Sequence, residues 1–238
     1  MNLHKVAIPK MKMPGEPVRT LSVLLACGIL SPLPVQAQQG GWTSIGPRPA
    51  GVEAPIVADP AGMGPAFIGS YGGGIRKTTD NGRTWTAANR GLTSMLVTSL
   101  AMDASGSQTL YAGTISGVFK TADGGATWGL VASGLIDNLA TDPNRPGVVY
   151  AGLLGGTISK TADGGASWKT VFSWTSAVYS FAIAYDNSDI VYAATLGGAF
   201  KSTDAGENWS PMPGLTPAAV WTLAIDPADS RASAARSV

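Results

Sequence analysis

Thr121-Ala122-Asp123-Gly124-Gly125-Ala126-Thr127-Trp128 decides the fold, because three further copies of this stretch occur in the chain. Every copy reads Ser/Thr-x-Asp-x-Gly-x-x-Trp, which we call the aspartate motif. The other copies are Thr78–Trp85, Thr161–Trp168 and Ser202–Trp209. Successive motif aspartates lie 43, 40 and 41 residues apart, and a near-constant period of this length indicates one structural unit repeated along the chain.

The rest of each unit repeats as well. A short apolar run ending in Asp occurs five times, and in four units a second run such as Tyr111-Ala112-Gly113-Thr114 follows it. A third run leads into the motif, whose Trp opens a fourth. Such runs, punctuated by Gly and Asp-Pro, are strand and turn signals, and no helical period is present. The sequence therefore predicts an all-β fold, a β-propeller of four-stranded antiparallel blades with about four complete blades and a partial fifth.

The aspartate motif has a structural explanation of its own. A carboxylate followed two residues later by Gly can accept hydrogen bonds from backbone N–H groups of its own turn, while Gly adopts a conformation that side chains resist. The motif is thus expected to tie the hairpin between the third and fourth strands. Its Trp offers more apolar surface than one thin blade can bury, so we expect it to lie between blades. A structural role for the four aspartates is favoured over a catalytic or metal-binding one.

The predicted topology sorts the loops by face. In a four-stranded antiparallel meander, the turns after the first and third strands share one end, which we call the motif face. The turns after the second strands and the connections between blades share the other end, the second face. Tyr71 and Trp174 lie there outside the repeated Trp position, so they are the candidate ligand-binding residues, the alternative being ordinary half-buried rim residues.

The N-terminus has the pattern of an export signal. Basic residues precede the apolar run Leu21–Leu30, which is about half the length of a membrane-spanning helix, and the small-residue site Val35-Gln36-Ala37 follows. We expect residues 1–37 to be a signal peptide cleaved after Ala37, with Met11 and Met13 as alternative starts. The mature protein would then be secreted or periplasmic, with no membrane insertion.

Cleavage would also remove the only histidine, His4, and the only cysteine, Cys27. Without imidazole or thiol, the mature chain is expected to have no disulfide, no His-ligated metal, no Cys nucleophile and no Ser-His-Asp triad. Beyond Ala37, twelve basic residues face fourteen acidic ones, a net charge of −2. This balance does not suggest nucleic acid as a partner, and we expect no cofactor.

The motif at blade spacing resembles the BNR/Asp-box repeat superfamily, and the resemblance covers nearly everything from Trp42 to Asp226. That superfamily includes sortilin-type receptors, the photosystem II assembly-factor type, and xyloglucanase-type and sialidase-type enzymes, so it implies the propeller fold without one chemistry. The arginine segment of sialidases, Phe/Tyr-Arg-x-Pro, has only an echo in Gly46-Pro47-Arg48-Pro49. Xyloglucanase-type enzymes carry an Asp before a Gly-Gly pair in the first blade, and Tyr71 stands at that position.

Glycoside hydrolysis by the common route needs two carboxyl groups across the scissile bond. Outside the motifs, the strand ends and the motif-face turns, only Glu53 and Asp137 remain, without an evident pairing. We therefore expect no catalytic residues and a non-catalytic propeller that acts as a scaffold for a protein or glycan partner. The alternative functions are a glycoside hydrolase-like propeller fragment that lacks its catalytic pair and a truncated, inactive product.

The repeat pattern stops abruptly near the C-terminus. Trp42 matches an outermost strand, four complete units follow, and Trp221–Asp226 supplies one further first strand. The next residues have no aromatic side chain and no apolar alternation. We therefore expect a propeller domain over residues 38–230 that is incomplete, with exposed strand edges, and a disordered tail over residues 231–238.

Overall fold

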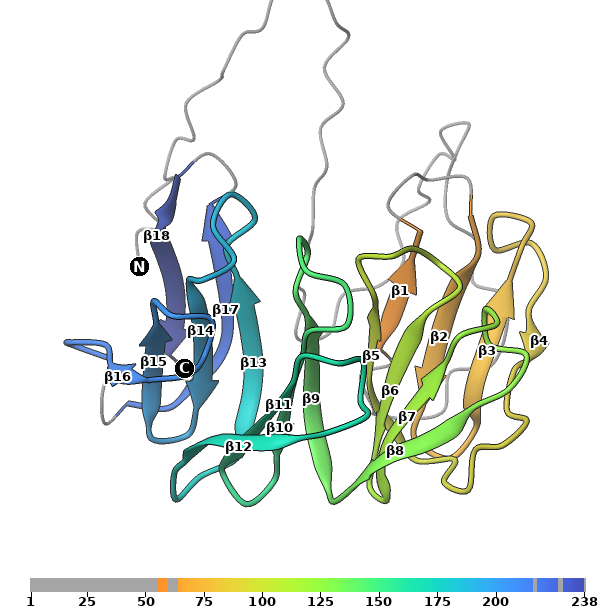
Figure 1. Cartoon of the computed structure of the whole chain (residues 1–238), viewed down its shortest axis with the longest axis horizontal. Helices are drawn as coiled ribbons and strands as arrows, with labels where there is room; N and C mark the ends of the chain where they lie inside the picture. Colours follow the sequence, from red (N-terminus) through yellow and green to blue (C-terminus); the bar gives the residue numbers. More distant parts are fainter. Residues whose placement is uncertain (1–54, 60–63, 216–217, 227–228, 238) are drawn as a thin grey trace, which may run out of the picture. The chain divides into compact units, whose positions relative to one another are not determined.

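The computed structural model describes residues 55–59, 64–215, 218–226 and 229–237, and every regular element among them is a β-strand. Four sheets have four antiparallel strands each, hydrogen-bonded in chain order, and a fifth sheet has two strands (Figure 1). The expected signal peptide, residues 1–37, the candidate acid Glu53 and the expected start of the propeller at residue 38 lie outside the described residues. No described helix is long and apolar enough to cross a membrane.

Each four-stranded sheet is one blade, and its four strands are the four runs that the sequence predicts. Register supports the assignment, since Tyr111 in the second strand of blade 2 pairs with Ala101 of the first and Lys120 of the third. The strands are, for blade 1, β1 Ile56–Ala58, β2 Ala66–Ser70, β3 Gly74–Thr78 and β4 Thr86–Ala87; for blade 2, β5 Val97–Met102, β6 Leu110–Thr114, β7 Gly117–Thr121 and β8 Gly129–Ser133; for blade 3, β9 Ile136–Thr141, β10 Val149–Leu153, β11 Thr157–Thr161 and β12 Lys169–Ser173; and for blade 4, β13 Val178–Ile183, β14 Val191–Thr195, β15 Gly198–Ser202 and β16 Ser210–Pro211.

The fifth sheet corrects one expectation. Strand β17, Val220–Asp226, is the expected first strand, but the segment predicted to be a disordered tail forms strand β18, Asp229–Ser237, which pairs antiparallel with it. Apolar alternation is absent from this segment because the pairing uses the backbone. Backbone N–H and C=O groups are available at every residue except proline, whatever the side chain.

The apolar core lies between blades rather than within one. The first strands of consecutive blades contact one another, β5 against β9 and β9 against β13, and each core cluster draws its side chains from two neighbouring blades. Phe67 and Ile75 of blade 1 pack with Leu110 and Phe119 of blade 2, all with 0% exposure. We call each such contact between neighbouring blades a seam.

The aspartate motif closes its hairpin by hydrogen bonds, as the sequence predicts. In the second copy, Asp123 Oδ1 accepts bonds from the Thr121 hydroxyl at 2.7 Å and from Thr127 N–H at 2.9 Å, while Oδ2 accepts from the Thr127 hydroxyl at 2.5 Å. Gly125 has a φ of 84° and donates its N–H to Thr121 Oγ1 at 3.0 Å. The other three copies repeat these contacts, so each carboxylate is used within its own turn.

These bonds also make the motif carboxylates strong acids. Hydrogen bonds from the side chain and then the backbone N–H of the residue four positions later lower the pKa of Asp80 and of Asp204 to about 2. A carboxyl whose pKa is lower in the folded state stabilises the fold above its unfolded pKa of about 4, and that contribution is lost as pH falls towards 2. We expect the urea midpoint to drop between pH 4 and 2, and to drop less in Asp80→Asn. Equal pH profiles for the two proteins would contradict this assignment.

The motif tryptophans are less uniformly buried than predicted. Trp128 is 4% exposed, and its Nε1 donates to Ala88 O of blade 1 at 2.9 Å, so it spans the first seam. Trp168 and Trp209 pack against the cores of the next two seams but are half-buried, as is Trp85. The expectation of four largely buried tryptophans is therefore correct for Trp128 alone, because the indoles of the other three keep one edge at the surface.

One motif turn holds an alanine in a conformation that favours glycine. Ala205 has a φ of 59°, where the second and third copies have Gly124 and Gly164. The left-handed conformation costs an L-residue about 1–2 kcal/mol, which exceeds the ~0.5–1 kcal/mol that a glycine loses in chain entropy. We expect Ala205→Gly to raise the free energy of unfolding by about 0.5 kcal/mol in urea titrations. Asn81→Gly, at the same position of the first motif, is the matched control with a smaller gain, because Asn tolerates this conformation.

The seams share their apolar core but differ in their polar contacts. At the first two seams, Lys77 and Lys120 each donate to a motif carbonyl of the next blade, Gly124 O and Gly164 O, at 2.8 Å. The buried hydroxyl of Tyr111 has no hydrogen-bond partner among the described residues. Neighbouring blades are thus joined by copies of one lysine contact at these two seams.

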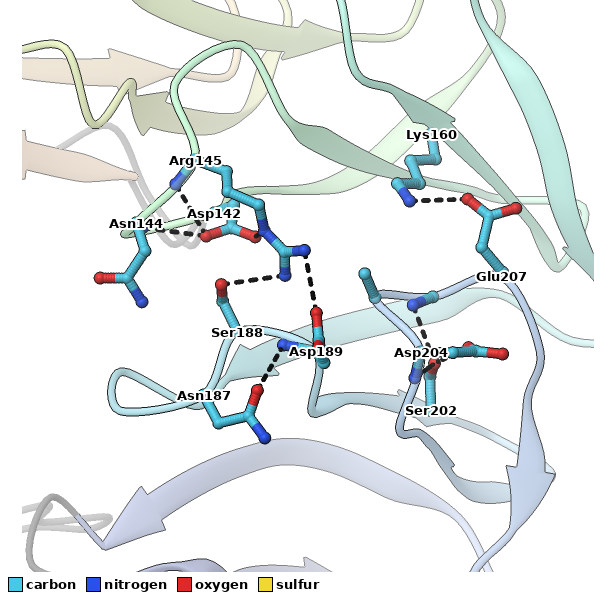
Figure 2. A network of polar contacts seen from close by, with 12 residues as sticks. Asp142, Asn144, Arg145, Lys160, Asn187, Ser188, Asp189, Ser202, Asp204 and Glu207 are labelled. Atoms are coloured by element: carbon cyan, nitrogen blue, oxygen red, sulfur yellow. Dashed lines mark hydrogen bonds and ion pairs between the residues drawn. The ribbon is translucent and has the colours of Figure 1, made fainter.

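The third seam, between blades 3 and 4, replaces this contact with a wider network (Figure 2). Lys160 pairs with Glu207 at 2.7 Å, and the Tyr150 hydroxyl donates to Ala205 O at 2.7 Å. Arg145 joins the buried carboxylate of Asp142, at 2.8 Å, to Ser188 and Asp189 of blade 4, each at 2.9 Å. The third seam is therefore the one with the most polar contacts between blades. These contacts are listed for seams 1 to 3 in the order of the chain.

Candidate functional site: the second face

Backbone contacts confirm that the loops divide between two faces. On the motif face, the turn after each first strand meets its own motif: Gly124 N–H donates to Gln108 O and Gly164 N–H to Gly147 O, both at 2.9 Å. On the second face, the turn after a second strand meets a connection between blades. Gly72 N–H donates to Met95 O at 2.9 Å, and Leu154 N–H to Leu135 O at 3.1 Å. The two sets of loops thus lie at opposite ends of the strands.

Exposed apolar side chains gather on the second face. Of the ten exposed large apolar residues among those described, seven lie in its turns, its connections or at the adjoining start of β17. Tyr185, 76% exposed, is on the motif face. Scattered apolar side chains are normal on protein surfaces, but a concentration on one face is typical of an interaction surface. The seven are Tyr71, Met95, Leu135, Leu154, Trp174, Leu196 and Trp221.

Trp174 is supported from below and open above. Its ring lies 4.9 Å, centroid to centroid, from Phe200 in an edge-on arrangement and 6.2 Å from Phe172 in a stacked one. The turn at Gly197 approaches so closely that a Cβ there would lie 2.5 Å from the indole Nε1. The side chain nevertheless remains 41% exposed. Trp174 is therefore held rigidly while presenting aromatic surface to solvent.

Tyr71 occupies a separate position. It is 48% exposed and forms an isolated β-bridge with Leu96, in the connection from blade 1 to blade 2. Trp174 belongs to the connection from blade 3 to blade 4, and no described contact joins the two residues. The sequence thus placed both candidate residues on the second face, whereas the structure does not bring them together as one site.

A row of side chains that sequence reasoning missed lies at the second residue of successive first strands. Its members share one place in the repeat, which aligning Ile136-Asp137-Asn138-Leu139 with Val178-Tyr179-Ser180-Phe181 could have revealed. Tyr179 and Trp221 are in contact, with ring centroids 4.7 Å apart. The row consists of Thr98, Asp137, Tyr179 and Trp221.

Asp137 differs chemically from the other acidic residues. One of its carboxyl oxygens, Oδ2, is buried and has no hydrogen-bond partner among the described residues, and burial raises the pKa of the group. A raised pKa is a property of catalytic acids, but glycoside hydrolysis requires a second carboxyl group facing the first. The described residues place no second carboxylate in hydrogen-bonding contact with Asp137 and contain no cluster of His, Cys, Asp or Glu able to hold a metal.

Comparison with known proteins identifies the architecture. No protein-family profile matches the sequence, and no curated protein is significantly similar to it. Solved structures do match: an ancestral GH74 enzyme is 25% identical with a TM-score of 0.66, over 72% of this chain and 26% of its own. The GH74 xyloglucanase from Xanthomonas campestris is 17% identical with a TM-score of 0.60, over 71% and 31%.

A third match comes from a different functional class. YCF48, solved bound to a D1 peptide, is 20% identical with a TM-score of 0.56, over 78% of this chain and 63% of its own. The chain is a β-propeller protein. It spans about a quarter to a third of the two GH74 enzymes, and the likeness to the xyloglucanase and to YCF48 concerns the fold. The propeller fold is therefore common to enzymes and to a peptide-binding protein.

Proposed function

We propose that this propeller is an exported, non-catalytic scaffold that holds an extended protein segment on its second face. The observation that carries the proposal is the concentration of exposed apolar side chains there, with Trp174 fixed against Phe200 and partly open to solvent. Rigid aromatic anchors of this kind dominate the binding energy of many protein interfaces. The peptide complex of YCF48 supports this use of the fold.

Selection from a displayed library of random linear peptides on the folded protein tests the proposal. We expect Trp174→Ala to weaken the binding of selected peptides at least about tenfold, as for an aromatic anchor of an interface. Tyr185→Ala is the matched control, because Tyr185 is an exposed aromatic residue on the motif face. Peptides that lose affinity in Tyr185→Ala and retain it in Trp174→Ala would refute a second-face site.

The second candidate is a glycoside hydrolase-like propeller, favoured by the 25% identity to an ancestral GH74 enzyme and by the raised pKa of Asp137. We nevertheless expect the protein to release no reducing sugar from xyloglucan, because Tyr71 replaces the expected acid and Asp137 has no described partner carboxylate. Assays across pH 4–8 check this expectation. Sugar release that disappears in Asp137→Asn would establish the enzymatic function instead.

A further inference from the structure

The first strands of neighbouring blades are held in a fixed register. Thr98 Oγ1 donates to Ile136 O at 2.8 Å, and Ser99 Oγ accepts from Leu139 N–H at 2.9 Å. Thr98 therefore lies opposite the start of β9. Strand β9 contacts β13, and β13 contacts β17. The same step along the repeat places Asp137 opposite Val178 and Tyr179, and the ring contact of Tyr179 with Trp221 fits the next step.

Asp137 brings an uncompensated negative charge to this row. Thr98, one blade earlier, satisfies its hydroxyl by donating to a carbonyl, but an ionised carboxylate has no proton to donate. The ion pairs among the described residues do not include Asp137, and Oδ2 has no hydrogen-bond partner there. A partly buried carboxylate without a donor is costly, so its presence calls for a group that supplies one.

The neighbours of Asp137 indicate the chemistry of that group. Tyr179 and Trp221 form an aromatic pair, and Trp221 is 46% exposed at the second face. Aromatic ring faces attract cations, and a carboxylate forms its strongest hydrogen bonds with charged donors. We propose that Asp137, Tyr179 and Trp221 form a seat for a lysine or arginine side chain of the protein segment that binds the second face. This proposal rests on the proposed function and specifies the charge of its ligand.

A cation fits the row better than a neutral sugar does. Sugars also stack on aromatic rings, but their hydroxyl groups leave the negative charge of Asp137 uncompensated. The chain's own lysines near this level of the fold are used elsewhere: Lys77, Lys120 and Lys160 are each bound at a motif of the next blade. The charge of Asp137 is therefore available to a partner.

Titration by nuclear magnetic resonance tests the seat with N-acetyl-lysine N-methylamide as the probe. The indole N–H signal of Trp221, assigned with Trp221→Phe, is the readout. We expect the lysine probe to shift this signal and to bind at least about fivefold more tightly than its neutral isostere N-acetyl-norleucine N-methylamide. Asp137→Asn should remove the preference, whereas Asp189→Asn, which changes the net charge equally on the motif face, should preserve it.

Several outcomes would overturn the seat. These are equal affinity for the two probes, an unchanged preference in Asp137→Asn, no shift of Trp221 by the lysine probe, and a larger shift by cellotetraose. Thermal unfolding of Asp137→Asn verifies that the variant is folded. If the lysine preference is absent while selected peptides still depend on Trp174, the seat is refuted and the scaffold function stands. If peptides bind elsewhere, the scaffold function itself fails.

Discussion

Trp128→Ala is expected to lower the free energy of unfolding by about 3–5 kcal/mol, the range for removing a buried large aromatic side chain. The indole is 4% exposed and packs against Phe67, Ile75 and Leu92 of blade 1. Its removal opens a cavity in the first seam and leaves Ala88 O without the Nε1 donor at 2.9 Å. Equilibrium urea unfolding at neutral pH measures the change.

Two variants separate the causes of that loss. Trp128→Phe keeps most of the apolar surface and removes the N–H donor, so it should lose about 1–2 kcal/mol. Trp85→Ala removes the same side chain from a half-buried site and should cost roughly half as much as Trp128→Ala. If Trp85→Ala and Trp128→Ala are equally destabilising, burial at the first seam does not explain the stability.

Arg145→Met is expected to cost about 2–3 kcal/mol, although the arginine side chain is 39% exposed. The carboxylate of Asp142 is 0% exposed and receives Arg145 Nε at 2.8 Å. Without the guanidinium, this buried charge keeps only the backbone N–H donors of residues 144 and 145. The variant also loses the bonds to Ser188 and Asp189, so blade 4 is less firmly attached.

Asp189→Asn is the matched control for this network. It removes the ionic contact at the exposed end, where the Asp189 side chain is 54% accessible, and should change stability by less than about 1 kcal/mol. Urea unfolding of both variants, with 0.1 and 1 M salt, gives the comparison. A larger loss in Asp189→Asn than in Arg145→Met would place the main contribution at the surface pair rather than at Asp142.

The sequence predicts the strands and the turns of this propeller because their causes are local. The carboxylate of Asp80 bonds Thr84, four residues away, so the motif turn can be inferred from eight residues. The seam contacts cannot be inferred in this way. Lys160 and Glu207 are 47 residues apart, and only the packed blades show that they meet. Strand β18 was missed because backbone pairing leaves no mark in side-chain pattern.

The functional prediction divides along the same line. The second face follows from strand connectivity, so Tyr71 and Trp174 could be placed on it by sequence alone. The row of Asp137, Tyr179 and Trp221 depends on how the first strands align across three blades, with the aromatic pair 4.7 Å apart. Each member looks like an ordinary strand residue in its own segment. Their juxtaposition is a property of the assembled blades.

The differences between seams have a consequence for how the repeated units keep their order. The four motif turns are nearly interchangeable, so the turns alone would allow a blade to dock beside a wrong neighbour. Glu207 meets Lys160 and Lys169 of blade 3, whereas the third motif has Ala166 at the corresponding position. A misplaced blade would therefore leave Lys160 or Glu207 unpaired. The diverged seam residues act as addresses that direct each copy of an ancient duplication to its own place in the chain.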